Sequence, residues 1–462
     1  MYDYFERLEA RGLIRSGLLS TKPFSRLEGA RLVDEALRIW STLPEDKKGE
    51  MPSVSAMFNR LEKEFRGDMT PQGYLKPVDT AYIKYIYSHS IPDHLNTNSN
   101  GDTLNEGHNL RAGFSSAVKL WDSISFYIAP EFRSNEEGSE GRLIQGYGIL
   151  SIRNIDVEAG KEPMWWGPGF HGAFLLTNNA EPFDMIRLAS QRAFLLPWFF
   201  SKLGPFKPTW FLTELEAERD FPHAKLMGIR LDFKPLPSFR FALSRVVMFG
   251  GEGRKRLSFG DWVKVLIAND KAEHSSSGID NDNILSLDFS LVANGLDRLL
   301  PFDGVKFYGE IGAEDSSGNG WPKEKAFLTG LFIEGPFSVE NTGLRIEWAT
   351  TAKNAKHDAW YSHGVYTSGY RYKDHIIGHH MGADAEDLFA RFEYLTTGGS
   401  KIGVETDIER RGVHAASIDN RTWLGLDLTY PLYETLNIGM GYGFENGDES
   451  SSTVWSRMEW DF

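Results

Sequence analysis

The stretch VWSRMEWDF, residues 454–462, decides the fold that the sequence predicts. In an extended chain every second side chain points to the same face, so Trp460 and Phe462 share a face with the even-numbered positions before them. The odd-numbered positions carry charges from Arg457 to Asp461. This alternation predicts a β-strand with one polar face and one apolar face, the apolar face ending on an aromatic residue.

This stretch also resembles the terminal insertion signal of Gram-negative outer-membrane barrels, an alternating strand with a final aromatic residue. The strand predicted before it, over residues 436–444, has apolar side chains at its even positions. Only Asn437 and three glycines occupy the odd positions between them, and such small residues suit the interior of a barrel. The two strands together favour a transmembrane barrel over a sandwich of two sheets.

The period of two recurs through residues 73–462, where Gly, Pro, Asn or Asp bound each alternating segment. In residues 285–291, for example, Leu, Leu, Phe and Leu at the odd positions alternate with Ser, Asp and Ser. About 390 residues accommodate roughly 16 to 20 strands of the length that such barrels use. We predict a transmembrane β-barrel of about 18 antiparallel strands, with polar connections such as 135–141 and 313–323 as loops outside the cell.

Residues 1–72 follow a helical pattern instead, and we predict a small α-helical segment on the periplasmic side. Ser25 and Glu28 have the spacing of a capping box, and apolar residues then recur at spacings of three and four until about Pro44. A rival interpretation makes this segment a module for peptidoglycan or another envelope partner, because the helix that follows Pro23 loosely resembles surface-layer-homology helices.

The composition suits a barrel and excludes several other classes of protein. The chain contains 46 Gly, 20 Pro, 13 Trp, 17 Tyr and 31 Phe, the residue types of tight turns and aromatic girdles. A net charge of −14, without a run of Lys or Arg, argues against a nucleic-acid partner. The lack of Cys excludes disulfides, thiolate metal sites and a lipid anchor at an N-terminal Cys. Because the first residues lack the features of a signal peptide, we expect that one has been removed.

The sequence contains no G-x-S-x-G elbow, no H-E-x-x-H and no Walker A motif. We therefore predict a protein that is not an enzyme. An outer-membrane hydrolase is an alternative, because its Ser and His would lie far apart in the sequence.

The most unusual local sequence is MWWGPGFH, residues 164–171, which is followed by two asparagines. Adjacent indole rings stack on the apolar faces of sugar rings, and side-chain amides exchange hydrogen bonds with hydroxyls. One interpretation is a saccharide contact, and the other is that the aromatic residues wedge a turn or plug inside the barrel. The residues concerned are Trp165, Trp166, His171, Asn178 and Asn179.

A second dense region, residues 360–384, combines aromatic, basic and histidine side chains. These groups would either contact a polysaccharide or line the lumen as a polar loop that is folded inward. The candidates for either role are Trp360, Tyr361, His363, Tyr366, Tyr370, Arg371 and Lys373.

Two groups of residues carry atoms that ligate divalent metals. His375, His379 and Asp384 belong to the second dense region, where glycines break any helix that would fix their spacing. Asp280 and Asp282 offer oxygen ligands for Ca²⁺ in an outer loop, but they lack the Gly and terminal Glu spacing of an EF-hand. A lumenal loop and a solvated turn are the alternatives. Apart from such a Ca²⁺ ion, the sequence predicts no cofactor.

Several motifs together resemble the capsule assembly Wzi family. They are WWGPG at 165–169, NNA at 178–180, HGVY at 363–366, SGY at 368–370, MGAD at 381–384 and, in the opening segment, KPFSRLE at 22–28. The resemblance covers nearly the whole chain. It implies an 18-stranded outer-membrane barrel, closed toward the periplasm by helices and restricted outside by loops, which acts as a lectin for capsular or related exopolysaccharide.

From this resemblance we expect a cell-surface protein that binds and retains extracellular polysaccharide with its outer loops. Its other partners would be outer-membrane lipid and lipopolysaccharide, and we favour a monomer. Arg371 and Lys373 are candidates for holding acidic sugars. The alternative function is a porin-like diffusion channel for small polar solutes, which a continuous polar lumen would permit.

Overall fold

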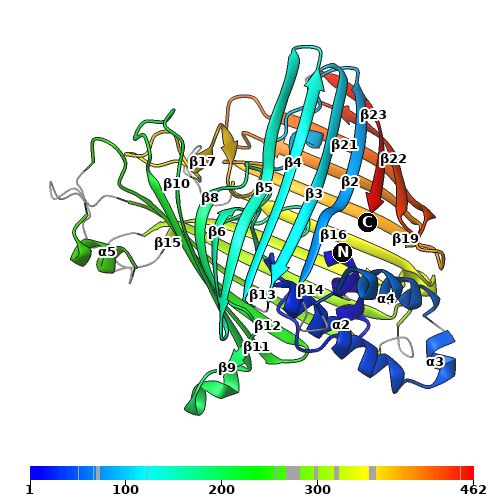
Figure 1. Ribbon diagram of the computed structural model, residues 1–462. Helices are drawn as coiled ribbons and strands as arrows, with labels where there is room; N and C mark the ends of the chain where they lie inside the picture. Colours follow the sequence, from blue (N-terminus) through cyan, green and yellow to red (C-terminus); the bar gives the residue numbers. More distant parts are fainter. Residues whose placement is uncertain are drawn as a thin grey trace.

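Among the residues that the computed structural model describes, eighteen antiparallel strands close into one barrel (Figure 1). The structure describes residues 1–49, 51–65, 67–68, 73–121, 123–254, 257–266, 281–295, 300–316, 322–352, 360–447 and 449–462. The first strand of the wall, β2 (Tyr74–Ser88), pairs with the last, β23 (Ser450–Asp461), and this pairing closes the barrel. The predicted transmembrane barrel of about 18 strands is thus confirmed.

The strands of the wall follow one another around the barrel in chain order, each hydrogen-bonded to the next. A two-residue strand, β9 (Phe194–Leu195), pairs with the first two residues of the strand that begins at Pro205. The strands between β2 and β23 are β3 (Gly107–Leu120), β4 (Ile124–Asn135), β5 (Gly138–Ile152), β6 (Ile155–Lys161), β8 (Asp184–Ser190), β10 (Pro205–Glu214), β11 (Lys225–Leu236), β12 (Phe239–Phe249), β13 (Asp282–Asn294), β14 (Gly304–Ser316), β15 (Pro322–Glu334), β16 (Thr342–Thr350), β19 (Ala385–Leu395), β20 (Lys401–Arg411), β21 (Asp419–Tyr433) and β22 (Leu436–Asn446).

The outer face of the wall is apolar and much of its inner face is polar, the reverse of a water-soluble sheet. In β13, Leu285 and Leu287 face outward with 44% of their surface exposed, whereas Ser286 and Asp288 between them are buried inside the barrel. A polar side chain buried in the lumen needs partners there, while an exposed leucine on the wall suits contact with lipid. The alternation in residues 285–291 therefore marks a strand of a transmembrane barrel, as the sequence predicted.

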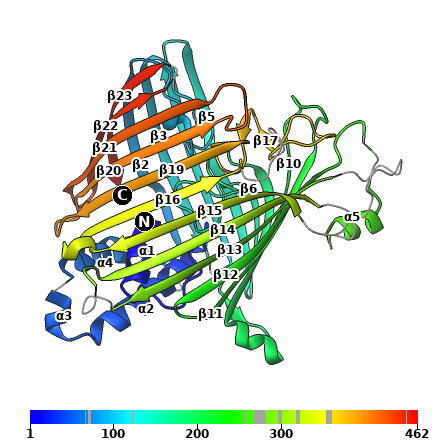
Figure 2. The same ribbon diagram turned by 180° about the vertical axis from the view of Figure 1, so that it is seen from behind.

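The helices of residues 2–65 gather at one end of the barrel (Figures 1 and 2). Helix α2, over residues 26–41, begins where the sequence predicted. The amide of Glu28 donates to the Oγ of Ser25 at 3.1 Å and so caps this helix. Apolar faces of these helices pack into a core that lies at this end of the barrel. The helices are α1 (Tyr2–Ala10), α2 (Arg26–Ser41), α3 (Glu45–Gly49) and α4 (Pro52–Phe65).

The longest connections lie at the opposite end, whereas several connections at the helical end are turns of two residues. Residues 89–106, 162–183, 250–281 and 351–384 join strands at the outer end, whereas β11 and β12 are joined at the helical end by two residues. Barrels of this class place short turns in the periplasm and long loops outside the cell. The helical end is therefore periplasmic.

Small elements occur within these connections. They are β1 (Thr21–Lys22), η1 (His94–Asn96), β7 (Trp165–Trp166), η2 (Trp198–Leu203), α5 (Phe259–Leu266), η3 (Pro336–Ser338), β17 (Arg371–Tyr372) and β18 (His375–Ile376). Within the described ranges, no helix is long and apolar enough to cross a lipid bilayer.

Candidate functional site

Two outer connections fold into the barrel and fill its lumen. Segments 164–185 and 360–385 supply many of the buried side chains of one continuous apolar cluster, which also includes inward-facing residues of the wall. The first segment reaches far enough to pair with the chain that enters from the periplasmic side. In this pairing Thr21 lies opposite Trp166 and Lys22 lies opposite Trp165, so β1 and β7 form a two-stranded sheet inside the barrel.

Helix α1 closes the periplasmic mouth through buried ion pairs with the wall. Arg7 Nη1 lies 3.0 Å from both carboxylate oxygens of Glu334 on β15, and Arg7 Nη2 lies 3.2 Å from Glu393 on β19. Glu6 lies 3.1 Å from Lys306 and 2.8 Å from Arg345. Burial alone would raise the pKa of Glu6, but these two cations lower it to about 2.

A buried arginine anchors β1 to the wall above this helix. Arg230 on β11 is fully buried, lies 2.7 Å from Asp288 and donates to the hydroxyl of Thr21 at 2.6 Å. Thr21 in turn donates to Asp232 at 2.7 Å. A charge buried without partners would be costly, so this network specifies where the entering chain lies.

The inward-folded segments 164–185 and 360–385 together form a plug in the lumen. The aromatic residues predicted as saccharide contacts lie inside this plug. Trp166 is 1% exposed and packs edge-on against Phe211, with ring centroids 5.3 Å apart. Tyr361 stacks on Tyr370 at 5.5 Å, and its hydroxyl donates to the carbonyl of Phe174 at 2.7 Å. Burial raises the pKa of Tyr361. Trp165, Trp360, Tyr366, His171 and Asn179 are buried as well. The structure thus places these residues in the lumen rather than on the outer surface.

The basic candidates remain at the surface. Arg371 and Lys373 are both exposed; Arg371 donates to the carbonyl of Asp374 at 3.0 Å, and Lys373 lies 2.9 Å from Glu181. His363 and Asn178 are half-buried. Of the twelve residues predicted as polysaccharide contacts or lumen lining, these four keep some access to solvent at the outer end.

The metal ligands that the sequence suggested do not converge on one point. His375 Nδ1 faces the carbonyl of Lys373 at 2.9 Å, and Asp384 pairs with His414 at 2.6 Å. His379 lies apart from both, with its Nε2 3.8 Å from Asp387. Asp282 is buried at the start of β13, and Asp280 lies outside the described residues.

A different set of ligand-type residues meets inside the barrel, and no motif in the sequence indicated it. One ligand atom of each lies within 4.8 Å of those of the others. Local motifs could not identify the set, because its members come from two loops and two strands. The sequence did hold one signal for this set. Aspartates fall on the lumenal faces of two strands, and histidines occur in the loops that fold against them. The four residues are His171, His380, Asp387 and Asp407.

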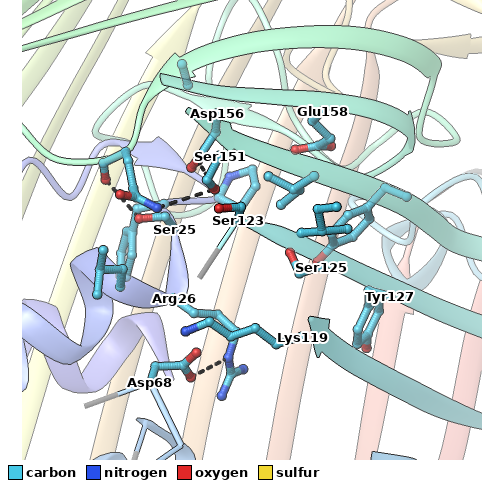
Figure 3. A pocket seen from close by; sticks show the side chains of 18 of the residues that line it. Ser25, Arg26, Asp68, Lys119, Ser123, Ser125, Tyr127, Ser151, Asp156 and Glu158 are labelled. Atoms are coloured by element: carbon cyan, nitrogen blue, oxygen red, sulfur yellow. Dashed lines mark hydrogen bonds and ion pairs between the residues drawn. The ribbon is translucent and has the colours of Figure 1, made fainter. Parts of the chain in front are cut away.

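A cavity of about 570 Å³, lined by both polar and apolar side chains, lies between α2 and the neighbouring wall (Figure 3). Its volume falls within the range of ligand-binding pockets. Ser151 donates to Asp156 at 2.6 Å on one side, and Arg26 contacts Asp68 at 2.8 Å on the other. Burial and the neighbouring carboxylate of Glu158 raise the pKa of Glu162, which also lines the cavity, to about 8. The lining mixes hydroxyl, acidic and basic groups near the periplasmic turns.

Three comparisons relate the chain to known proteins. A family model described as capsule assembly protein Wzi matches residues 90–451. An uncharacterized 55.8 kDa protein in the cps region of Klebsiella pneumoniae is 25% identical over 346 residues, which are 70% of this chain but only 58% of that protein. The solved structure of Escherichia coli Wzi, described as an outer-membrane protein of group 1 capsule assembly and a carbohydrate-binding β-barrel, superposes with a TM-score of 0.75. It shares 20% identity, and the match covers 100% of this chain and 98% of that one.

Another solved barrel shares the fold at lower sequence identity. OccD3 (OpdP) of Pseudomonas aeruginosa superposes with a TM-score of 0.50 at 10% identity, covering 84% of this chain and 91% of that one. At such low identity the likeness concerns the barrel architecture and not its ligand.

Proposed function

The chain belongs to the capsule assembly protein Wzi family and is an outer-membrane β-barrel, and from this premise we propose that it binds and retains capsular or related extracellular polysaccharide at the cell surface. Binding is reversible and involves no covalent chemistry. The outward apolar face of the wall contacts outer-membrane lipid and lipopolysaccharide, and the barrel acts as a monomer.

The observation that carries this proposal is the filled lumen. Segments from the outer end pack against one another, against the wall and against β1, which enters from the periplasmic end. A diffusion channel needs a continuous aqueous path, whereas the described part of the lumen holds a packed apolar cluster. This arrangement favours a closed barrel whose outer loops form a binding platform over the porin-like alternative.

Local cationic groups supply the contacts that an acidic polysaccharide requires. The chain as a whole carries a net charge of −14, so long-range attraction does not bring such a polymer to it. Arg371 and Lys373 are exposed at the outer end, where they can donate charge-assisted hydrogen bonds to sugar carboxylates. The buried aromatic residues then act by shaping the loop that presents these two groups.

A matched pair of double variants tests the proposal. Arg371→Ala with Lys373→Ala removes two cations from the outer end, and Arg38→Ala with Lys202→Ala removes the same two types of cation from the periplasmic end. We expect the outer variant to bind an acidic capsular polysaccharide about tenfold more weakly or worse, from the loss of roughly 1.4 kcal/mol or more. The periplasmic variant should bind like the wild type. Equal binding by all three proteins would contradict the assignment to these residues.

A further inference from the structure

The four ligand-type residues inside the barrel come from separate parts of the chain. His171 lies in the inward-folded segment 164–183 and His380 in the inward-folded segment 360–384, while Asp387 and Asp407 project from β19 and β20. All four side chains are buried, with exposed fractions of 7%, 5%, 2% and 4%. The cluster thus joins both loops of the plug to the wall.

The distances between the ligand atoms resemble the edges of a metal-ligand tetrahedron. Four ligands placed 2.0–2.2 Å from a zinc ion lie about 3.3 to 3.6 Å from one another. His171 Nε2 lies 3.2 Å from Asp407 Oδ2 and 3.7 Å from Asp387 Oδ2. His380 Nε2 lies 3.3 Å from Asp387 Oδ2. Small side-chain adjustments would bring the whole set, all within 4.8 Å, onto one ion.

The hydrogen bonding of the cluster is incomplete. Among the described residues, neither oxygen of Asp387 and neither ring nitrogen of His380 has a hydrogen-bond partner, although both side chains are buried. His380 Nε2 does lie 2.9 Å from Glu409, but without the geometry of a hydrogen bond. Buried polar atoms are nearly always satisfied, so atoms left in this state at the centre of a cluster call for a further partner.

The surroundings fix the orientation of the cluster. Phe389 stacks on the ring of His171 at 4.1 Å with an interplanar angle of 8°. The backbone amides of residues 170–172 all donate to the carboxylate of Glu347, at 2.8 to 3.1 Å. On the other side, His94 Nδ1 lies 3.1 Å from the Asp407 oxygen that faces His171. Supporting contacts of this kind hold metal ligands in place in known sites.

We propose that His171, His380, Asp387 and Asp407 bind one divalent transition-metal ion, zinc foremost, which latches the two inward-folded loops to the barrel wall. Two imidazoles and two carboxylates suit zinc and its neighbours, whereas Ca²⁺ and Mg²⁺ take oxygen ligands. The ion would also neutralise two carboxylates that would otherwise face each other in the low-dielectric interior. This latch acts in the plug and does not depend on which ligand the outer loops bind.

Metal analysis of the full-length protein tests the latch. The barrel is refolded in detergent with Zn²⁺ or Co²⁺, washed with chelator and analysed for metal by mass spectrometry. We expect about one equivalent of metal per chain, and visible absorption of four-coordinate Co²⁺. Less than about one tenth of an equivalent with either ion would overturn the proposal.

Two variants and a control locate the site. Asp387→Asn and His380→Ala should each lose the bound metal, whereas His375→Ala, from the same loop, should keep it. The folding of each variant is checked by the heat-modifiable mobility of the barrel in gels. If one site variant misfolds, the metal content of the other variant tests the site. Metal also should raise the melting temperature of the wild type and leave that of Asp387→Asn unchanged. Full metal content in both site variants would place the ion elsewhere and refute the assignment. Polysaccharide binding is measured separately and has no part in this outcome.

Discussion

Replacing Glu334 by Gln should release helix α1 from the periplasmic mouth of the barrel. The Glu334 carboxylate is fully buried and accepts hydrogen bonds from Arg7 at 3.0 Å and from Arg11 at 2.9 and 3.1 Å. Glutamine keeps the shape of the side chain but removes the charge, and its NH₂ group faces two guanidinium donors. Breaking a buried pair in this way costs about 3 to 5 kcal/mol. We expect about 3 kcal/mol, because Arg7 keeps its contact with Glu393 and Arg11 keeps Asp303 at 3.3 Å.

A loss of about 3 kcal/mol raises the population of the undocked helix roughly 150-fold. Trypsin cleavage after Arg11 reports this population when reclosing is faster than cleavage. The Glu334→Gln protein should therefore be cleaved at this bond about 150-fold faster than the wild type, with the barrel still folded. Glu45→Gln is the control, because Glu45 has 88% of its side chain exposed. Equal cleavage of wild type and Glu334→Gln would refute the role of the buried ion pairs in docking.

Three further predictions concern the two inward-folded loops and helix α1. Trp166→Ala removes a ring that is 1% exposed and packed on Phe211, so it should lower the free energy of unfolding by about 3 to 5 kcal/mol in urea titrations, whereas Trp121→Ala, at a site 76% exposed, should change it by about 0.5 kcal/mol or less. The wild type should show no steady conductance in planar bilayers, and replacement of residues 163–182 by a short Gly-Ser linker should open a pore; a silent variant would count against the plug. The pKa of Glu6 falls from 4.5 to about 2 when α1 docks. The free energy that Glu6 contributes to docking is therefore complete above about pH 5, declines as the pH falls and is lost below about pH 2. Hydrogen exchange of the α1 amides should show this loss, and no change in exchange over that range would contradict it.

The wall of the barrel was predictable because its signal is local. Alternation in 285–291 and 454–462 depends only on which face of a strand each residue occupies. Strand β13 spans the first stretch, and β23 spans the second up to Asp461. The start of α2 was predictable for the same reason, since Ser25 and Glu28 form the cap from within one turn.

Strand ends were harder to predict, because polar strands continue beyond the membrane. Residues 135–141 were expected to form a surface loop, yet β4 and β5 meet in a tight hairpin in which Asn135 lies opposite Gly138. Likewise β14 continues to Ser316 within the expected loop 313–323. Polar composition marks exposure to water, and water-exposed backbone can still pair into a ladder.

The inward folding of the loops could not be read from the sequence. The motifs at 164–171 and 360–384 were identified as unusual, but their aromatic content suits a sugar contact and a packed plug equally. Contacts such as His171 with Asp407 join residues 236 positions apart, and no periodic pattern encodes such a pairing. The histidine and aspartate cluster was missed for this reason.

The most direct test of the account is to titrate purified capsular and exopolysaccharides onto the detergent-purified barrel and to record bilayer conductance from the same preparation. We expect saturable binding of at least one polysaccharide and no steady conductance. Steady conductance without binding of any polysaccharide would contradict it and would favour a diffusion channel.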